Sequence, residues 1–187
     1  MYETKKSAAD IFNNDINNLR KLSVDIGKDK NGEVVTIKYF ENPQLLVTGS
    51  DDKRQTELIN TMLAGVILKT NPDDVKLIVI DEMNELDRFN GLPHLLWPVI
   101  TDTKKALETL KWVRDEKNHR GVNIMCFEEP DIMGYNALAA KKVPFIVLVI
   151  NGMKKLLQKN EAELKEIMSS FLWEPVGNCQ VLSSHQL

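Results

Sequence analysis

Several features are scarce in this sequence, and each shortage excludes a class of protein. Only two cysteines, Cys126 and Cys179, occur among the 187 residues; they lie too far apart to form a metal-binding pattern, and reduced thiols are expected. The longest apolar run, residues 143–150, has eight residues, whereas a membrane-spanning helix needs about 20. The N-terminal residues are too polar for a secretory signal. We therefore expect a cytoplasmic chain without a membrane segment.

An excess of basic charge is also lacking. The 24 Lys and Arg residues are outnumbered by 27 Asp and Glu residues, and the formal net charge is −3. Such a balance does not by itself predict nucleic-acid binding, although a local basic face remains possible. The lysine pairs at 104–105, 141–142 and 154–155 are candidates for DNA contact, but a solvated face is the more common meaning of such pairs.

The hydrophobic pattern predicts a single α/β domain. Residues 24–37 form two alternating apolar and polar segments around Asn31-Gly32, which is typical of a tight hairpin. Strand-like and helix-like segments then alternate, which favours a three-layer domain with a mostly parallel sheet. The expected strands are 44–49, 75–81, 143–150 and 179–184, with a short extended piece within 94–101. The expected helices are 56–70, 104–116, a short one within 127–142, and 161–171.

Several segments together resemble the motor domain of the FtsK/SpoIIIE-type DNA translocases. They are IGKDKNGEVV, NPQLLVTG, TNPDDVKLIVID, GLPHLLWPVITDTKKALETLKW, MGYN with VPFIVLVI, and VLSSHQL. The resemblance implies a RecA-like P-loop NTPase fold over residues 22–187, with 1–21 as a helical or flexible segment. The family's motor continues beyond the segment that matches residues 179–187, so we expect that continuation to be lacking here.

The phosphate-binding loop of the family departs from its pattern in this chain. The P-loop pattern is G-x-x-x-x-G-K-[ST], and the stretch GSDDKRQT keeps Gly49 and Thr56 at its two ends. Arg54 stands at the second glycine and Gln55 at the lysine that neutralises the phosphates. Asp51 or Asp52 is expected to cap the following helix instead.

The carboxylates expected at the end of the next central strand are missing as well. The family has Asp-Glu there, for the Mg²⁺ shell and for activating water, whereas this chain has Asn151-Gly152. The sensor segment reads Ser184-His185-Gln186 rather than Thr-Gln-Arg. Asp81 ends an earlier strand, and a bond to a neighbouring loop is a more common role for such a residue than catalysis. His94 is expected to be structural.

These departures lead to three alternative functions. The first is a non-hydrolysing structural module that assembles with itself or with a competent FtsK-like motor; it predicts no catalytic residue, no metal and no cofactor. The second is an ATP- and Mg²⁺-dependent DNA-translocating motor of the chromosome-segregation type with an unusual nucleotide site. The third is a partner-binding module unrelated to DNA. The residues of the degenerate site are Gly49, Arg54, Gln55, Thr56, Asn151 and Gly152.

Overall fold

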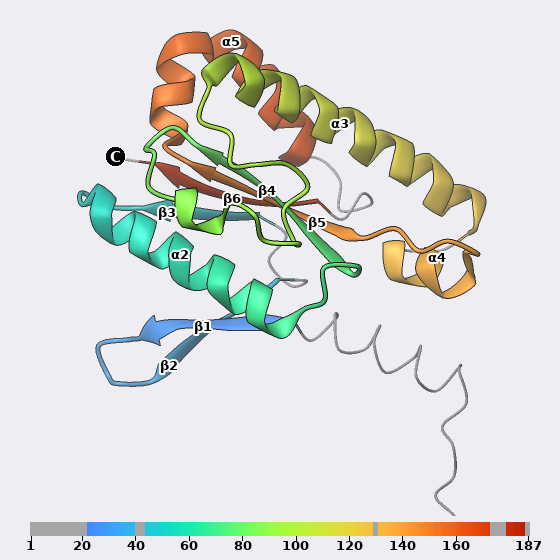
Figure 1. The fold of residues 1–187 in the computed structure, drawn as a ribbon, viewed down its shortest axis with the longest axis horizontal. Coiled ribbons are helices and arrows are strands. Elements are labelled where there is room, and N and C mark those ends of the chain that lie inside the picture. Colours follow the sequence, from blue (N-terminus) through green and yellow to red (C-terminus); the bar gives the residue numbers. More distant parts are fainter. Residues whose placement is uncertain (1–21, 40–43, 129–130, 173–178, 186–187) are drawn as a thin grey trace, which may run out of the picture.

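The computed structural model describes residues 22–39, 44–128, 131–172 and 179–185 (Figure 1). Its centre is a four-stranded sheet with the spatial order β3-β6-β5-β4, in which each neighbouring pair is parallel. The strands are β3 (Gln44–Thr48), β4 (Val75–Asp81), β5 (Phe145–Asn151) and β6 (Cys179–His185). The segment 1–21, expected to be helical or flexible, lies outside the described residues.

The two middle apolar runs of the sequence form strands that are buried on both faces. Along β4, Leu77 and Val79 pack into one hydrophobic cluster, while Ile78 and Ile80 pack into a second cluster on the opposite face. β5 alternates in the same way. Each such side chain contributes roughly 1.5–3 kcal/mol when it is fully buried. Because both faces are buried, these two strands require a continuous apolar run rather than an alternating one.

Helices cover both faces of the sheet. α2 (Asp52–Lys69) supplies the first cluster and lies on one side, while α3 (Thr103–Cys126) and α5 (Met153–Leu172) supply the second cluster on the other side (Figure 1). The short α4 (Ile132–Leu138) follows α3 and contributes to the first cluster. The expected three-layer α/β arrangement is confirmed.

The predicted hairpin is present and docks on α2. β1 (Ser23–Lys28) pairs antiparallel with β2 (Val34–Lys38), and Gly32 in the turn has the positive φ of 84° that the Asn-Gly sequence favours. Val24 lies against Gly65 of α2 so closely that a Cβ at that glycine would be 2.4 Å from Val24 Cγ1. Lys69 Nζ also donates a hydrogen bond to the Ser23 carbonyl at 2.6 Å. The absent side chain at Gly65 is what lets the hairpin approach the helix.

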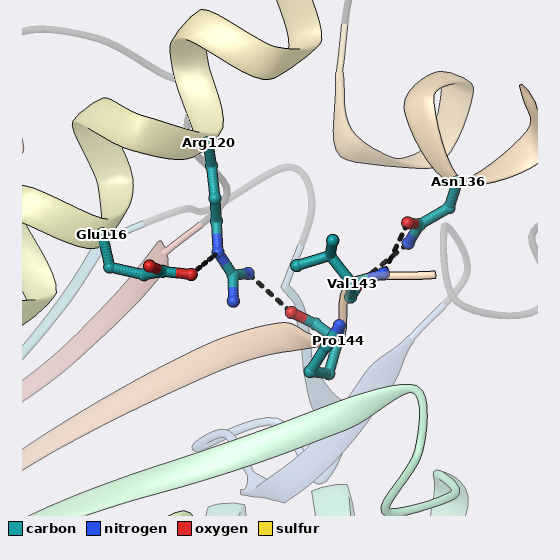
Figure 2. Close-up of polar contacts among 5 residues, drawn as sticks. All are labelled: Glu116, Arg120, Asn136, Val143 and Pro144. Atoms are coloured by element: carbon teal, nitrogen blue, oxygen red, sulfur yellow. Dashed lines mark hydrogen bonds and ion pairs between the residues drawn. The ribbon is translucent and has the colours of Figure 1, made fainter. Parts of the chain in front are cut away.

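Polar contacts tie the segment before β5 to α3 and α4 (Figure 2). Arg120, which is buried, donates from Nε to Glu116 Oε1 at 2.7 Å and from Nη1 to the Pro144 carbonyl at 2.6 Å. The Asn136 side chain donates to the Val143 carbonyl and accepts from the Val143 amide, both at 2.8 Å. These side chains satisfy backbone groups of the segment that precedes β5.

Several expected boundaries were wrong. The short extended piece expected within 94–101 makes two isolated bridges to β4, at Leu95 and Ile100. α2 begins at Asp52, α3 continues to Cys126, and α5 begins at Met153 with non-helical backbone at Asn160.

Candidate functional site

The loop between β3 and α2 ends in a carboxylate that caps the helix. Asp51 is the N-cap residue, and its Oδ1 accepts hydrogen bonds from the backbone amides of Lys53 at 3.0 Å and Arg54 at 3.2 Å. The first amides of a helix have no partner within the helix, and they attract negative charge. The expectation that one of the two aspartates caps the helix is confirmed. Both amides therefore point at a side chain of the protein.

The buried Gln55 side chain bonds back to the start of the same loop. Its side chain is only 5% exposed, and Nε2 donates a hydrogen bond to the Gly49 carbonyl at 3.0 Å. Arg54, by contrast, extends into solvent, with its Nε 3.4 Å from Asp51 Oδ2. Such an exposed ion pair contributes little to stability.

Thr56 and Asn151 meet at the floor of the candidate site. Thr56 Oγ1 donates to Glu85 Oε2 at 2.5 Å. Asn151 Nδ2 donates to Asp81 Oδ1 at 2.9 Å and lies 3.4 Å from Thr56 Oγ1. The fold thus brings together two residues 95 positions apart that sequence reasoning assigned to one site. Glu85 was missed, because it lies in a loop without a recognisable motif.

Asp81 organises the loop that follows β4. Its carboxylate is fully buried and accepts from the amides of Met83 at 3.1 Å, Glu85 at 2.6 Å and Leu86 at 2.7 Å. With the Asn151 amide, four donors converge on this one group. The bond to a neighbouring loop expected for a strand-end residue is confirmed.

Gly152 has a conformation that excludes most other residues. Its φ is +87°, in the left-handed region that L side chains rarely adopt. A Cβ placed there would lie 3.1 Å from Glu82 Cβ and 3.2 Å from Met83 Cγ. A glutamate at this position would therefore strain both the backbone and the neighbouring loop.

A small cavity lies over these residues. Its volume is about 80 Å³, and its lining comprises Asp52, Gln55, Thr56, Met83, Asn151, Gly152, Lys154 and Lys155. Sites that enclose drug-sized ligands typically measure roughly 300–1,000 Å³. Lys155 Nζ donates to the Glu82 carbonyl at 3.1 Å, so this cation is held by the protein backbone.

The remaining predicted residues lie elsewhere. His94 is buried, with Nε2 3.1 Å from the Thr70 carbonyl, which fits the structural role expected for it. Lys105 lines a separate surface hollow with Trp97 and Trp112, so the lysine pairs do not all gather around one cavity. Within the described ranges, no group of three or more His, Cys, Asp or Glu residues is arranged to hold a metal ion.

Comparison with known sequences decides the family. The sequence profile of the FtsK/SpoIIIE family matches residues 15–172. The chain belongs to the FtsK/SpoIIIE family. It is 35% identical over 151 residues to the DNA translocase FtsK of Borreliella burgdorferi and 34% identical over 148 residues to that of Staphylococcus epidermidis. These matches cover 77% and 73% of this chain but only 19% of each relative.

Solved structures share the fold of this FtsK/SpoIIIE chain. The pCW3 conjugation coupling protein TcpA, solved with ATPγS, superposes with a TM-score of 0.72 and 14% identity, over 88% of this chain and 48% of TcpA. ATPases 2 and 3 of EssC from Geobacillus thermodenitrificans give a TM-score of 0.70 and 20% identity, over 90% and 34%. The expected RecA-like P-loop fold is confirmed. In the part of the chain that the structure describes, no helix is both long and apolar enough to cross a bilayer.

Proposed function

We propose that this FtsK/SpoIIIE domain is a non-hydrolysing module that contributes to assembly rather than to ATP turnover. One observation carries the proposal: the Asp51 carboxylate accepts from the Lys53 and Arg54 amides at the start of α2. In a phosphate-binding loop, backbone amides at such a helix start cradle the phosphates. Here a carboxylate of the same chain takes their hydrogen bonds.

Electrostatic repulsion also disfavours phosphate binding at this loop. A phosphate approaching these amides would meet Asp51, and two like charges about 4 Å apart repel by up to about 4 kcal/mol at an effective dielectric constant of 20. Gln55 supplies no positive charge to offset this repulsion, and its amide is engaged by Gly49. Thr56, which would ligate Mg²⁺, donates to Glu85. The residues present therefore do not fit Mg²⁺-ATP in the way an ordinary P-loop does.

The strand end opposite the loop supports the same proposal. Asn151 is a neutral donor to Asp81, and Gly152 has the left-handed backbone that disfavours a glutamate. Phosphoryl transfer depends almost entirely on positioning and on charge stabilisation. A site without a lysine at 55 and without an acidic pair at 151–152 lacks the lysine of the electrostatic clamp and the two carboxylates that the family places at this strand end.

Family membership supports the proposed assembly role. The curated relatives are DNA translocases, and we assign to this chain a structural place beside itself or beside a competent motor of that type. The test is ATP hydrolysis with and without DNA, using a hydrolysing FtsK as the positive control. We expect no turnover above background from this chain alone. DNA-stimulated turnover that disappears in Thr56→Ala would overturn the proposal.

A second candidate function is a translocating motor with an unusual nucleotide site. Lys154 and Lys155 line the cavity beside Thr56, which would put cationic side chains near a phosphate without a P-loop lysine. This function predicts ATP-dependent DNA binding that weakens steeply with salt. Lys155→Ala would abolish that binding, whereas the exposed Lys165→Ala, on the same helix but outside the cavity lining, would leave it unchanged.

A further inference from the structure

A surface hollow separate from the candidate site lies where the segment after β4 meets α3. Its volume is about 460 Å³, and its lining comprises residues 97–102 together with Lys105, Glu108, Thr109 and Trp112. The structure describes every one of these residues, and none of them lines the cavity beside Thr56. We call it the tryptophan hollow, after Trp97 and Trp112. Its volume falls in the range of roughly 300–1,000 Å³ that is typical of ligand sites.

The two tryptophans form an aromatic corner in this hollow. Their ring centroids are 4.8 Å apart, and the ring planes meet at 80°. Trp112 remains 38% exposed, although tryptophan is a highly buried residue on average. The face of an indole ring attracts a cation that lies within about 6 Å of the ring centre. The corner therefore offers a contact for a cationic group with an apolar stem.

The charged residues of the tryptophan hollow favour a cation as well. Two of the three are acidic, Asp102 and Glu108, and one is basic, Lys105. Asp102 Oδ1 accepts from the Lys105 amide at 2.9 Å, which fixes this carboxylate at the start of α3. On the same helix, Asp115 and Glu116 each pair with an arginine. Within the described ranges Glu108 has no such ion pair, so its carboxylate is open to a ligand.

We propose that the tryptophan hollow receives an arginine side chain presented by a partner protein. A guanidinium group is planar and weakly hydrated, so it stacks on an aromatic face and donates two parallel hydrogen bonds to a carboxylate. Trp112 and Glu108 supply these two contacts. The apolar residues Val99 and Ile100 of the lining provide a surface for the stem of the arginine and for its neighbours in the partner. An anionic ligand would meet two carboxylates there and is disfavoured.

This inference goes beyond the proposed function, because it names the chemistry of a partner rather than the state of the nucleotide loop. The hollow lies within residues 97–112, whereas the loop lies between β3 and α2. Peptide binding and ATP turnover are separate readouts. Either result can fail while the other stands.

The test is a titration of the isotope-labelled whole chain with a short, blocked peptide that carries an arginine between two leucines. The matched peptide carries citrulline, which keeps the planar group but lacks the charge. We expect the indole N–H signals of Trp97 and Trp112 to shift with the arginine peptide, and the citrulline peptide to bind about tenfold more weakly. Equal binding of the two peptides, or unshifted indole signals at millimolar arginine peptide, would overturn the proposal.

Charge variants test whether Glu108 and Lys105 act on the bound cation. Glu108→Gln should weaken binding of the arginine peptide by about fivefold, and Lys105→Gln should strengthen it by about twofold. Both side chains are exposed, so these changes leave the core intact. The matched control is Glu57→Gln, at an exposed glutamate of α2 on the other side of the sheet (Figure 1), and it should bind like the parent chain. Unchanged binding by Glu108→Gln, or weaker binding by Lys105→Gln, would contradict recognition of a cation.

Discussion

Replacing Asp81 by alanine tests whether its carboxylate has a structural role. The Asp81 side chain is 0% exposed and accepts from three backbone amides and from Asn151. Alanine would leave these donors without an acceptor at the end of a buried strand. If the group is structural, its loss should appear in the free energy of unfolding whether or not the protein has any activity.

The expected magnitude follows from the number of donors. A buried group left without its partner costs about 1–3 kcal/mol. The Leu86 amide is buried and the Met83 and Glu85 amides are partly buried, so water can reach some of the donors and the penalties do not simply add. We expect Asp81→Ala to lower the free energy of unfolding by about 3–5 kcal/mol, a large part of the roughly 5–15 kcal/mol of an ordinary domain.

Urea unfolding followed by tryptophan fluorescence measures this change. The matched control is Asp87→Ala, an exposed aspartate in the same loop region whose replacement should alter stability by no more than about 0.5 kcal/mol. If Asp81→Ala and Asp87→Ala unfold at the same urea concentration, the loop does not depend on Asp81, and the structural interpretation is refuted.

Two further predictions concern the hairpin and a buried tyrosine. Gly65→Ala should destabilise the protein by about 1–3 kcal/mol, because the added methyl group would collide with Val24. In the control Gly121→Ala, the methyl group meets nothing within 4 Å, and the change should stabilise α3 by about 0.5–1 kcal/mol. Equal effects of the two variants in thermal unfolding would contradict the close approach of Val24 to Gly65. Burial raises the pKa of the Tyr39 phenol above its ordinary value. The buried neutral phenol therefore contributes fully to the free energy of unfolding below about pH 10, and this contribution is lost as the pH rises further. Tyr39→Phe should lose less stability than the parent chain between neutral and strongly alkaline pH, and identical pH profiles would refute this.

Much of the fold could be predicted from the sequence because two of its sheet strands are uninterrupted apolar runs. The apolar runs that become β4 and β5 are long, and Asp51 precedes a helix in the position where capping chemistry operates. Residues 94–101 were predicted to contain a short extended piece, and they bridge β4 at two isolated points. An extended segment pairs continuously with a strand only if its backbone runs in the right direction. Amino-acid composition does not predict that direction.

The candidate site was predictable as a set of positions, but not as a network. Gly49 and Asn151 could be identified because each follows an apolar run, and Thr56 because it stands at the hydroxyl position of the P-loop pattern. The hydrogen bond from Thr56 to Glu85 could not, because Glu85 is fixed by the turn that Asp81 holds. The left-handed backbone of Gly152 was likewise not visible, since glycine is compatible with many conformations.

Calorimetric titration with Mg²⁺-ATP tests the central claim most directly, using the parent chain and a variant that carries Asp51→Gly, Arg54→Gly and Gln55→Lys. We expect no binding heat from the parent chain at hundreds of micromolar nucleotide, and measurable binding once the carboxylate is removed and the lysine is supplied. Binding of ATP by the parent chain in the low-micromolar range would contradict it. That result would mean that Asp51 yields the α2 amides to phosphate.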